Sequence, residues 1–253
     1  MWHGEKKKMA KTNFSTYLSI KQQLLDMFKN EEYENNKLPP ESELADMLGI
    51  SLVTLRESLL MLALEGYITK RHGSGNYVHR STLDFENRSI FFSDCLKNAG
   101  YTPGIKVISQ EIHPTTKEVS QALNISEQDP VLENRIIHTA DGLPAIYTVL
   151  TIPKALLTNT SIEAMDFRYL HELIWKYCHK NLAHSLNEYV PMGLPVEIAD
   201  IFTLEAGTPI IACKQVFYDT FDTPIIYSLS YFYPNLYRVR TLQNWALNIS
   251  SPQ

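Results

Sequence analysis

The side chains best suited to bind a polyanion lie within residues 51–75. Ser51 and Thr54 place hydroxyls at the start of an apolar-periodic segment, and Arg56 follows two residues later. Hydroxyls at a helix N-terminus suit phosphate oxygens, and an arginine can bind a phosphate or take guanine O6 and N7 with two hydrogen bonds. A basic, glycine-containing tip, KRHGSG, follows at residues 70–75. These residue types point to contacts with phosphates and base edges.

Sequence patterns for catalysis or metal binding do not occur. There is no GxSxG, HExxH or phosphate-binding loop, and the three cysteines form no CxxC pair. The histidines between residues 171 and 184 are spaced by eight and five residues, which misses the i, i+4 geometry of a helical metal pair. We therefore expect no catalytic residue, no metal and no cofactor. The odd cysteine count fits a reducing cytoplasm best.

The charge balance differs between the two halves of the chain. The 253 residues include 23 basic and 28 acidic ones, and the formal net charge of −5 does not by itself suggest a partner as anionic as DNA. Residues 1–80 hold eleven basic and ten acidic groups, so the acidic excess belongs to the rest. Affinity for a nucleic acid must therefore come from a few well-placed cations, and binding to non-specific DNA should be weak.

Three helices and a hairpin are predicted to position these groups. Apolar residues recur at helical spacing over residues 17–30, and a second helix begins at the prolines of LPPESELADMLGI and ends at Gly49. Ser51 is placed to cap a third helix, which ends at Gly66. The β-prone pieces YIT and NYVH then flank the KRHGSG tip. This order describes a winged helix-turn-helix, whose third helix can lie in the major groove while the hairpin tip reaches the backbone or the minor groove.

The motifs LPPESELA, LGIS, TLRESL, LEGYI and HGSGNYV occur in an order and spacing that closely resemble the DNA-binding domain of the GntR family of bacterial transcription regulators. The resemblance implies a DNA-binding domain over residues 14–79, preceded by a flexible basic N-terminus over residues 1–13. It also implies the following DNA contacts: Ser42, Ser51, Leu52, Val53, Thr54, Arg56, Arg71, His72 and Gly73.

Three of these positions depart from the family's usual residues. Leu52 and Val53 stand where an arginine and a small polar residue are common, and Ser42 replaces a frequent arginine. Losing a bidentate arginine–guanine contact removes about 1–3 kcal/mol of base discrimination, so the preferred operator should differ from the family's usual ones. Leu52 or Val53 can instead meet a thymine methyl. Two alternatives stay open, in which Arg56 is a surface residue paired with an acid and His72 is a solvated loop histidine.

The second half of the chain alternates strands and helices after a polar linker predicted at residues 80–89. Strands are expected in IKVISQEIH, VLENRIIHTADG, PAIYTVLTI, PIIACKQVFYD and PIIYSLSYFYP, and helices near FFSDCLKNAG, TKEVSQALN, MDFRYLHELIWKYCH and PVEIADIFTL. DG at 141–142 and FDTP at 221–224 are typical of hairpin turns. The fold class is therefore α+β, a winged helix-turn-helix followed by a domain with a mainly antiparallel sheet.

GYTP, ALNIS, DPVLENRIIHTADGLPAIYTVLTIP and DTPIIYSLSYFYPNLYR follow one another in this region. Their order resembles the UTRA domain of the HutC subfamily of GntR regulators, which has a chorismate-lyase-like fold. The resemblance implies an effector-binding and dimerisation domain over residues 90–250, with a pocket between the sheet and its covering helices. The candidate effector contacts are Arg135, Ile137, Thr148, Ile226, Ser228 and Ser230.

The composition of this candidate pocket departs from that of the family. Arg135 matches the first arginine of an Arg-x-Arg strand, whereas Ile137 replaces the second, and Thr148 and Ile226 replace two glutamates. The pocket should thus be less polar, and suit a small carboxylate or an amphipathic ligand held by Arg135 and by the threonine and serine hydroxyls. In the alternative, the isoleucines are ordinary sheet core and Arg135 pairs with Glu133 or another carboxylate.

Together the two resemblances imply a cytoplasmic, homodimeric transcription regulator, most often a repressor in this family. Its partners would be a double-stranded DNA operator and a small-molecule effector, which shifts DNA binding by a coupling of about 1–3 kcal/mol. No membrane association is expected, because no run approaches roughly 18 apolar residues. Two other classes stay open: a DNA-binding protein whose second domain only dimerises, and a lyase-like enzyme. The sequence identifies neither effector nor operator.

Overall fold

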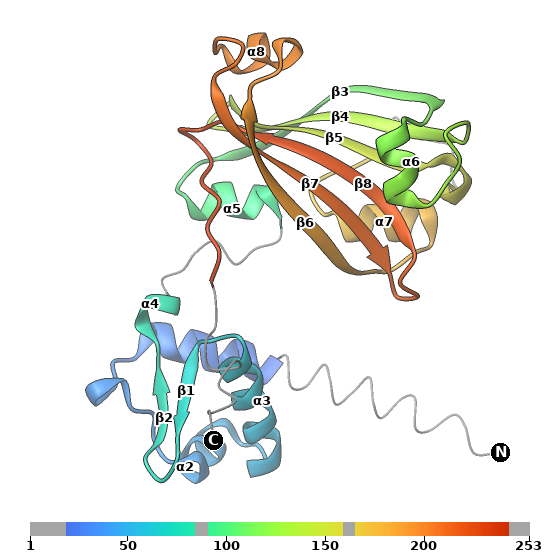
Figure 1. The fold of residues 1–253 in the computed structure, drawn as a ribbon. Helices are drawn as coiled ribbons and strands as arrows, with labels where there is room; N and C mark the ends of the chain where they lie inside the picture. The colour runs from blue at the N-terminus through green and yellow to red at the C-terminus, as the bar shows by residue number, and fades with distance from the viewer. Residues whose placement is uncertain (1–18, 84–90, 159–164, 243–253) are drawn as a thin grey trace, which may run out of the picture. The chain divides into compact units, whose positions relative to one another are not determined.

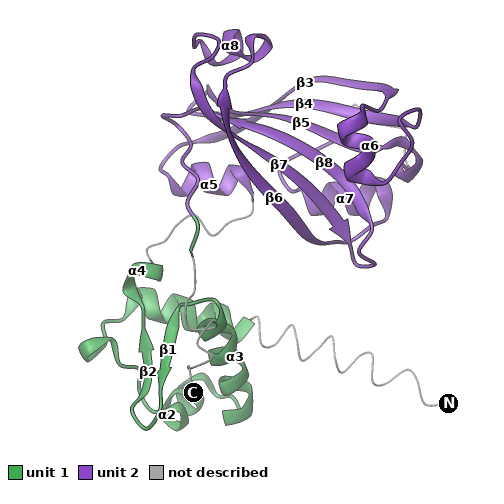
Figure 2. Cartoon of the chain, viewed as in Figure 1, with its two compact units in different colours: residues 1–86, 241–253 green, residues 87–240 purple. Residues whose placement is uncertain are grey.

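The computed structural model describes residues 19–83, 91–158 and 165–242 (Figure 1). The chain divides into two compact units, residues 1–86 with 241–253 (unit 1) and residues 87–240 (unit 2) (Figure 2). The N-terminal segment 1–13 and residues 84–89 of the predicted linker lie outside the described residues. Within the described ranges, no single helix is long and apolar enough to cross a membrane.

Unit 1 is a helix-turn-helix followed by a two-stranded wing, as predicted. Its elements in chain order are a helix over residues 19–30, the 3-10 turn η1 (Glu34–Asn36), α2 (Glu41–Leu48), α3 (Leu52–Leu64), β1 (Ile68–Arg71), β2 (Gly75–Val78) and α4 (Arg80–Leu83). β1 and β2 pair as an antiparallel hairpin.

Two residues set the turn between α2 and α3. Gly49 ends α2 with a φ of 63°, in the left-handed region that glycine adopts at little cost. Ser51 caps α3, because its side-chain oxygen accepts a hydrogen bond from the Thr54 backbone N–H at 3.1 Å. The two helices consequently meet at a bend of 107°, which is typical of a helix-turn-helix.

The core of unit 1 draws on every helix and on both strands of the wing. Its buried apolar residues include Ile20, Leu24, Phe28, Leu44, Leu55, Leu59, Leu62, Ile68, Val78 and Leu83. Arg80 of α4 donates hydrogen bonds to the backbone carbonyls of Phe28 and Glu31, at the end of the first helix. Residues 80–83 are therefore part of the folded unit, and the prediction that the linker begins at residue 80 is wrong for them.

Unit 2 is built on a six-stranded antiparallel sheet with the strand order β3-β4-β5-β8-β7-β6. The strands are β3 (Pro103–Pro114), β4 (Pro130–Ala140), β5 (Leu143–Pro153), β6 (Leu182–Gly193), β7 (Pro209–Asp219) and β8 (Pro224–Phe232). The helices are α5 (Phe92–Asn98), α6 (Lys117–Leu123), α7 (Leu170–Cys178) and α8 (Val196–Phe202), with a 3-10 turn, η2 (Lys154–Leu156). The predicted α+β class with a mainly antiparallel sheet is confirmed.

Helices lie on both faces of the sheet (Figure 1). α7 packs on one face, which we call the α7 face, against residues that include Ile136 and Ile226, and α5 packs on the same face. α8 packs on the opposite α8 face, against Ile137 and Tyr231, and α6 lies on that face next to β8. The central strands are therefore buried on both sides.

β6 was not among the predicted strands. Its sequence, LAHSLNEYVPMG, is largely polar, and most of its residues are exposed. β6 forms an edge of the sheet and pairs only with β7 in the described ladder. An edge strand needs neither an apolar run nor clean alternation, so hydrophobic periodicity gives little signal for it.

Candidate nucleic-acid interface and ligand site

The start of α3 exposes part of the predicted DNA-contact set. Ser51 is exposed, and its hydroxyl oxygen lies 2.8 Å from that of Thr54. Val53 is 65% exposed, whereas Leu52 is half-buried and packs against the core of unit 1. Of the two apolar departures from the family pattern, Val53 is therefore the more accessible to a thymine methyl.

Arg56 lies on the same helix and is paired with an acid. Its side chain is 58% exposed, and its Nε donates to Glu41 Oε2 at 2.8 Å. The alternative in which Arg56 pairs with an acid is therefore correct, and the partner, Glu41, lies in α2. A guanidinium carries five N–H donors, so the Nε bond leaves those on Nη1 and Nη2 for other acceptors. The same arginine can keep this pair and still bind a phosphate or a guanine.

The wing tip is turned by glycine and exposes a cation. Gly73 and Gly75 have φ values of 70° and 108°, which reverse the chain between β1 and β2. Arg71 lies over the Tyr77 ring, with its guanidinium carbon 4.0 Å from the ring centroid. Arg71, His72 and Gly73 are all exposed, so the three predicted wing contacts are accessible.

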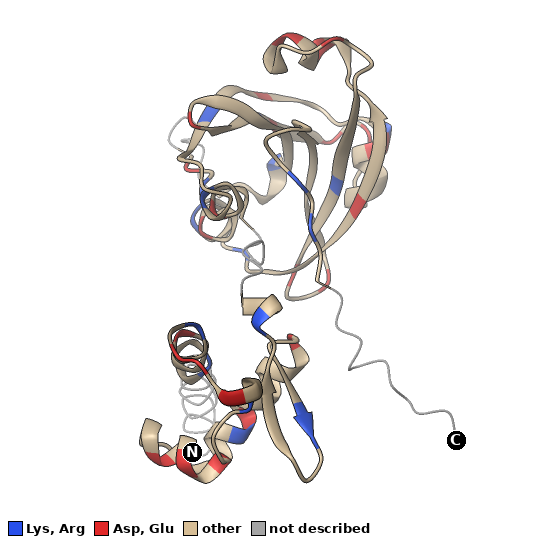
Figure 3. Ribbon diagram, turned by 90° about the vertical axis from the view of Figure 1, so that its left-hand side faces the viewer, with Lys and Arg blue, Asp and Glu red and all other residues tan. Residues whose placement is uncertain are grey.

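Glu41, in the first turn of α2, connects the helix to the wing. Besides Arg56, its carboxylate accepts hydrogen bonds from Lys70 Nζ at 3.0 Å and from Asn76 Nδ2 at 3.4 Å. The hydrogen bond from Arg56, together with Lys70, lowers the pKa of Glu41 from 4.5 to about 2, so the carboxylate stays charged. Ser42 is exposed beside it. Acidic and basic residues are interspersed over this unit rather than segregated (Figure 3).

In unit 2, the predicted effector contacts fall on opposite faces of the sheet. Arg135 of β4 pairs with Val149 of β5, whereas Thr148 pairs with Ile136. Directly paired residues share a face, and successive residues alternate between faces. Arg135 therefore lies on the α8 face and Thr148 on the α7 face. The expectation of one pocket that joins Arg135 to the hydroxyls is wrong.

A bulge in β5 causes this separation, because Thr139 pairs with Pro144 and His138 with Ile146, which leaves Ala145 as an extra residue. An unbroken ladder from the two-residue turn at 141–142 would place Arg135 opposite Thr148. The register instead shifts between His138 and Thr139, and a slip of one residue moves every later side chain to the other face. The sequence carries no evident signal for the bulge.

The contacts of Arg135 and Ile137 match the alternative in which Arg135 pairs with a carboxylate and the isoleucines are ordinary sheet core. The Nε of Arg135 donates to Glu133 Oε1 at 2.8 Å, and His113 Nε2 lies 3.3 Å from the same carboxylate. Ile137 is buried in the core under α8. Ile226, on the α7 face, is fully buried against α7 and its neighbours.

A group of buried polar side chains crosses the α7 face of the central strands. We call it the polar strip, and it consists of Asn134, His138, Thr148, Ser228 and Ser230. The hydroxyls of Thr148 and Ser230 lie 2.9 Å apart, and Asn134 Nδ2 donates to the Leu150 carbonyl at 3.2 Å. The strip is uncharged, so it offers hydrogen bonds and no ion pair.

Two members of the strip, Asn134 and His138, were not among the predicted contacts. His138 is the titratable one. Burial lowers its pKa from 6.5 to about 4, so the ring is neutral at pH 7. Its Nδ1 has no hydrogen-bond partner among the described residues, and the Phe92 ring packs edge-on at 5.2 Å. Buried polar atoms are normally paired, so an unpaired one in such a strip favours a place for a ligand or water. Only the shifted register brings His138 to this face.

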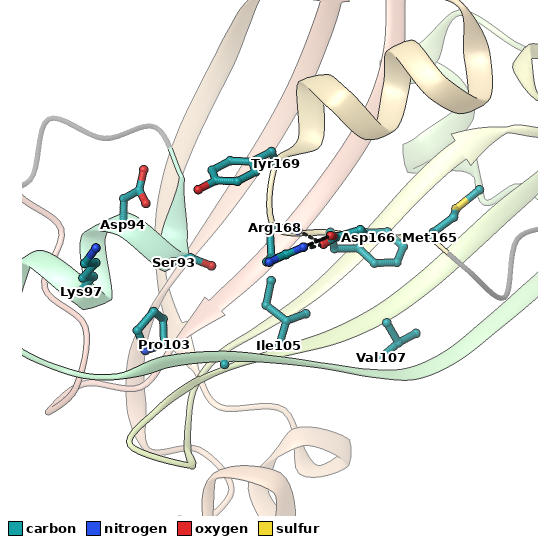
Figure 4. Close-up of a pocket in the computed structure, with 12 residues that line it drawn as sticks. Ser93, Asp94, Lys97, Pro103, Ile105, Val107, Met165, Asp166, Arg168 and Tyr169 are labelled. Carbon is teal, nitrogen blue, oxygen red and sulfur yellow. Dashed lines mark hydrogen bonds and ion pairs between the residues drawn. The ribbon is translucent and has the colours of Figure 1, made fainter.

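A cavity of about 490 Å³ opens on the α7 face between α5, β3 and residues 165–169 (Figure 4). Its apolar lining includes Ile105, Val107, Met165 and Phe167, and its charged lining is Asp94, Lys97, Asp166 and Arg168. Arg168 and Asp166 form an ion pair, with Nη2 2.6 Å from Oδ2. Ile105 pairs with His138 across β3 and β4, so the cavity lies beside the polar strip. The sequence placed residues 165–169 in a helix, which in fact begins at Leu170.

Both units match known families. Residues 16–78 match the bacterial regulatory proteins of the gntR family, and residues 98–238 match the UTRA domain. The chain belongs to the UTRA-containing GntR family. The family resemblance seen in the sequence is thereby confirmed. A GntR-family protein with a UTRA domain is a DNA-binding transcription regulator whose DNA binding is controlled by a small ligand.

Individual relatives of this GntR-family chain agree with that assignment. YurK of Bacillus subtilis, an uncharacterised HTH-type transcriptional regulator, is 25% identical over 221 residues, 87% of this chain and 91% of YurK. The HTH-type transcriptional repressor NagR of the same organism is 25% identical over 204 residues, 80% of this chain and 84% of NagR. The crystal structure of YydK, a possible transcriptional regulator of Bacillus subtilis, has a TM-score of 0.75 at 21% identity, covering 90% of this chain and 99% of YydK, which shows a shared fold.

Proposed function

We propose that this GntR-family regulator binds a partly palindromic operator as a homodimer and represses transcription in the cytoplasm until a small effector binds unit 2. The observation that carries the proposal is the exposed N-terminus of α3 beside a basic wing, both tied to Glu41. In such domains the second helix of the motif enters the major groove. The repressing sign follows NagR, which is named as a repressor.

Each group of predicted DNA contacts has a distinct proposed role. Arg56 reads a guanine or binds a phosphate through its Nη atoms, and Ser51 and Thr54 donate to phosphate oxygens. Val53 packs on a thymine methyl. The remaining contacts flank these and are Ser42, Leu52, Arg71, His72 and Gly73.

The proposed effector site is the cavity on the α7 face together with the polar strip. Hydroxyls of Thr148, Ser228 and Ser230 would bind the buried end of the ligand, beside the apolar Ile226. Apolar cavity residues would cover its body, and the lining cations Lys97 and Arg168 would bind a carboxylate. A small carboxylate or an amphipathic molecule fits this composition. Arg135 and Ile137 lie on the opposite face and are not part of the proposed site.

The proposed dimer uses the β6 edge. β6 is a 12-residue edge strand on which Leu186, Tyr189 and Met192 are exposed. A long edge strand with exposed apolar side chains is a pairing surface unless something covers it. Light scattering after gel filtration should give the dimer mass for the wild type and a monomer for Leu186→Glu.

Selection of bound duplexes from random DNA tests the DNA-binding part of the proposal. We expect an enriched sequence with two half-sites separated by about 10 base pairs or a multiple of this. Repression is then tested with a reporter gene placed behind the selected site. If no sequence is enriched, α3 does not read an operator.

A thermal-shift screen of a metabolite library tests the effector part. We expect at least one compound to raise the melting temperature and to change operator affinity. Thr148→Val should weaken that response, whereas Arg135→Ala, on the opposite face of the sheet, should leave it intact. If no compound stabilises the protein, unit 2 serves only for dimerisation. Turnover of chorismate by the purified protein would instead support an enzyme.

A further inference from the structure

Glu41 joins three elements of unit 1 through one carboxylate. Oε2 accepts from Arg56 of α3 at 2.8 Å, and Oε1 accepts from Lys70 of β1 at 3.0 Å and from Asn76 of β2 at 3.4 Å. The Glu41 side chain is 19% exposed, whereas those of Arg56 and Lys70 are 58% and 66% exposed. A largely buried anion thus holds two cations whose remaining atoms reach solvent.

An anion among DNA-binding cations affects specific and non-specific binding differently. Every cation that is free to neutralise a phosphate adds affinity for any DNA, whatever its sequence. Pairing Arg56 and Lys70 with Glu41 offsets part of that attraction. A contact with a base edge also needs the guanidinium to be held in one orientation, while a phosphate contact needs mainly its charge. The pair with Glu41 supplies that orientation.

We propose that Glu41 is a positioning residue that sets the ratio of operator affinity to non-specific DNA affinity. It orients Arg56 toward a base edge, ties Lys70 of the wing to the same point, and reduces the attraction of both to phosphate. This role rests on the proposed function, because it requires α3 to read an operator. It adds the expectation that removal of the Glu41 carboxylate strengthens binding to non-specific DNA and weakens binding to the operator.

Glu41→Gln tests the proposal, and Glu43 offers a matched control. The substitution keeps the size of the side chain and removes its charge. Glu43 lies in the same first turn of α2 and is exposed, and its side chain forms no hydrogen bond or ion pair with any residue in the described ranges. Glu43→Gln therefore makes the same change in net charge without disturbing Arg56 or Lys70.

The measurement is the Kd of the full-length protein for its selected operator and for a scrambled duplex of equal length, over a series of salt concentrations. We expect Glu41→Gln to bind the scrambled duplex about threefold to tenfold more tightly and the operator about tenfold more weakly. The slope of log K against log salt on the scrambled duplex should steepen by about 0.9, which is one added phosphate contact. Glu43→Gln should change both duplexes by similar, small factors.

Two further variants separate positioning from folding. Glu41→Asp keeps the charge but shortens the reach, so the affinity ratio should fall to an intermediate value while the melting curve stays cooperative. In an Arg56→Met background, Glu41→Gln should no longer weaken operator binding. The proposal is overturned if Glu41→Gln changes both duplexes by the same factor, if folded Glu41→Asp keeps the wild-type ratio, or if the double variant still shows the tenfold loss.

The wild type separates this role from the proposed function. A wild-type protein that does not distinguish operator from scrambled duplex overturns both. A wild type that discriminates, beside a Glu41→Gln variant with an unchanged ratio, overturns only the role of Glu41.

Discussion

Units 1 and 2 hold their candidate binding groups in opposite environments. In unit 1 the groups are charged, exposed and paired, as Arg56 and Lys70 are with Glu41. In unit 2 the polar strip is buried and uncharged, and includes a neutral His138. Exposed cations suit a partner that stays hydrated and anionic, whereas buried hydroxyls and amides suit a small ligand that leaves water.

The two environments should also respond differently to pH. The pKa of Glu41 is lowered to about 2, so its pairs stabilise unit 1 above its ordinary pKa of 4.5 and are lost as the pH falls toward 2. The pKa of His138 is lowered to about 4 from 6.5, so unit 2 is fully stabilised above pH 6.5 and weakens as the pH falls toward 4. A change in the stability of unit 2 is therefore expected between pH 5 and pH 7, where the Glu41 pairs of unit 1 stay intact.

The largest expected effect is the loss of that pH dependence in His138→Leu. Protonation of His138 in the unfolded chain should cost wild-type unit 2 about 2 kcal/mol between pH 7 and pH 5. The variant lacks the titrating ring, so calorimetry should show a smaller drop in its melting temperature over the same range. Equal drops in melting temperature in both proteins would mean that His138 has the same pKa in the folded and the unfolded state.

Next in size is the effect of Arg56→Ala on operator binding. The variant loses both a cation and a base contact, which should weaken operator binding about 10-fold to 100-fold. Lys29→Ala is the control, because Lys29 is an exposed cation near the end of the first helix. Fluorescence anisotropy on the selected operator gives both values. Similar losses in the two variants would show that α3 is not the reading helix.

The sequence predicted unit 1 better than unit 2, and the reason is physical. Gly49, Ser51 and the α3 leucines act within a few residues of one another, so local rules are sufficient to predict the turn and the buried face. The pair between Arg56 and Glu41 spans fifteen residues and depends on the angle between two helices. The sequence suggested an acidic partner for Arg56 but not which one.

In unit 2 the elements were predictable but the faces of the strands were not. Each predicted strand is present, yet one bulge beside His138 reverses the assignment of Arg135 and leaves Thr148 on the other face. Strand alternation is a rule of period two, so a single extra residue inverts it. The cavity lining was not predicted either. The helical pattern of the neighbouring residues led to a predicted helix at Arg168, whereas this residue lies in a loop that lines the cavity.

A smaller effect is expected for the hydrogen bond between Thr148 and Ser230. Thr148→Val and Ser230→Ala should each destabilise unit 2, because each removes one hydroxyl of the pair and leaves the other buried hydroxyl without this hydrogen bond. The double variant should lose less than the sum, with a coupling of about 1 kcal/mol. Urea unfolding of the four proteins provides the cycle. Strict additivity would show that the two hydroxyls do not pair in solution.

The smallest expected effect is that of Arg135→Ala, which tests whether the two faces of the sheet are separated as described. Arg135 is half-exposed and pairs with Glu133 near His113, and exposed ion pairs contribute about 0–1 kcal/mol. The variant should therefore unfold within about 1 kcal/mol of the wild type and keep its response to any effector found in the screen. Thr148→Val, by contrast, changes a side chain on the α7 face. A loss of effector response in Arg135→Ala equal to that in Thr148→Val would place the ligand on the α8 face, and the polar strip would then be part of the core alone.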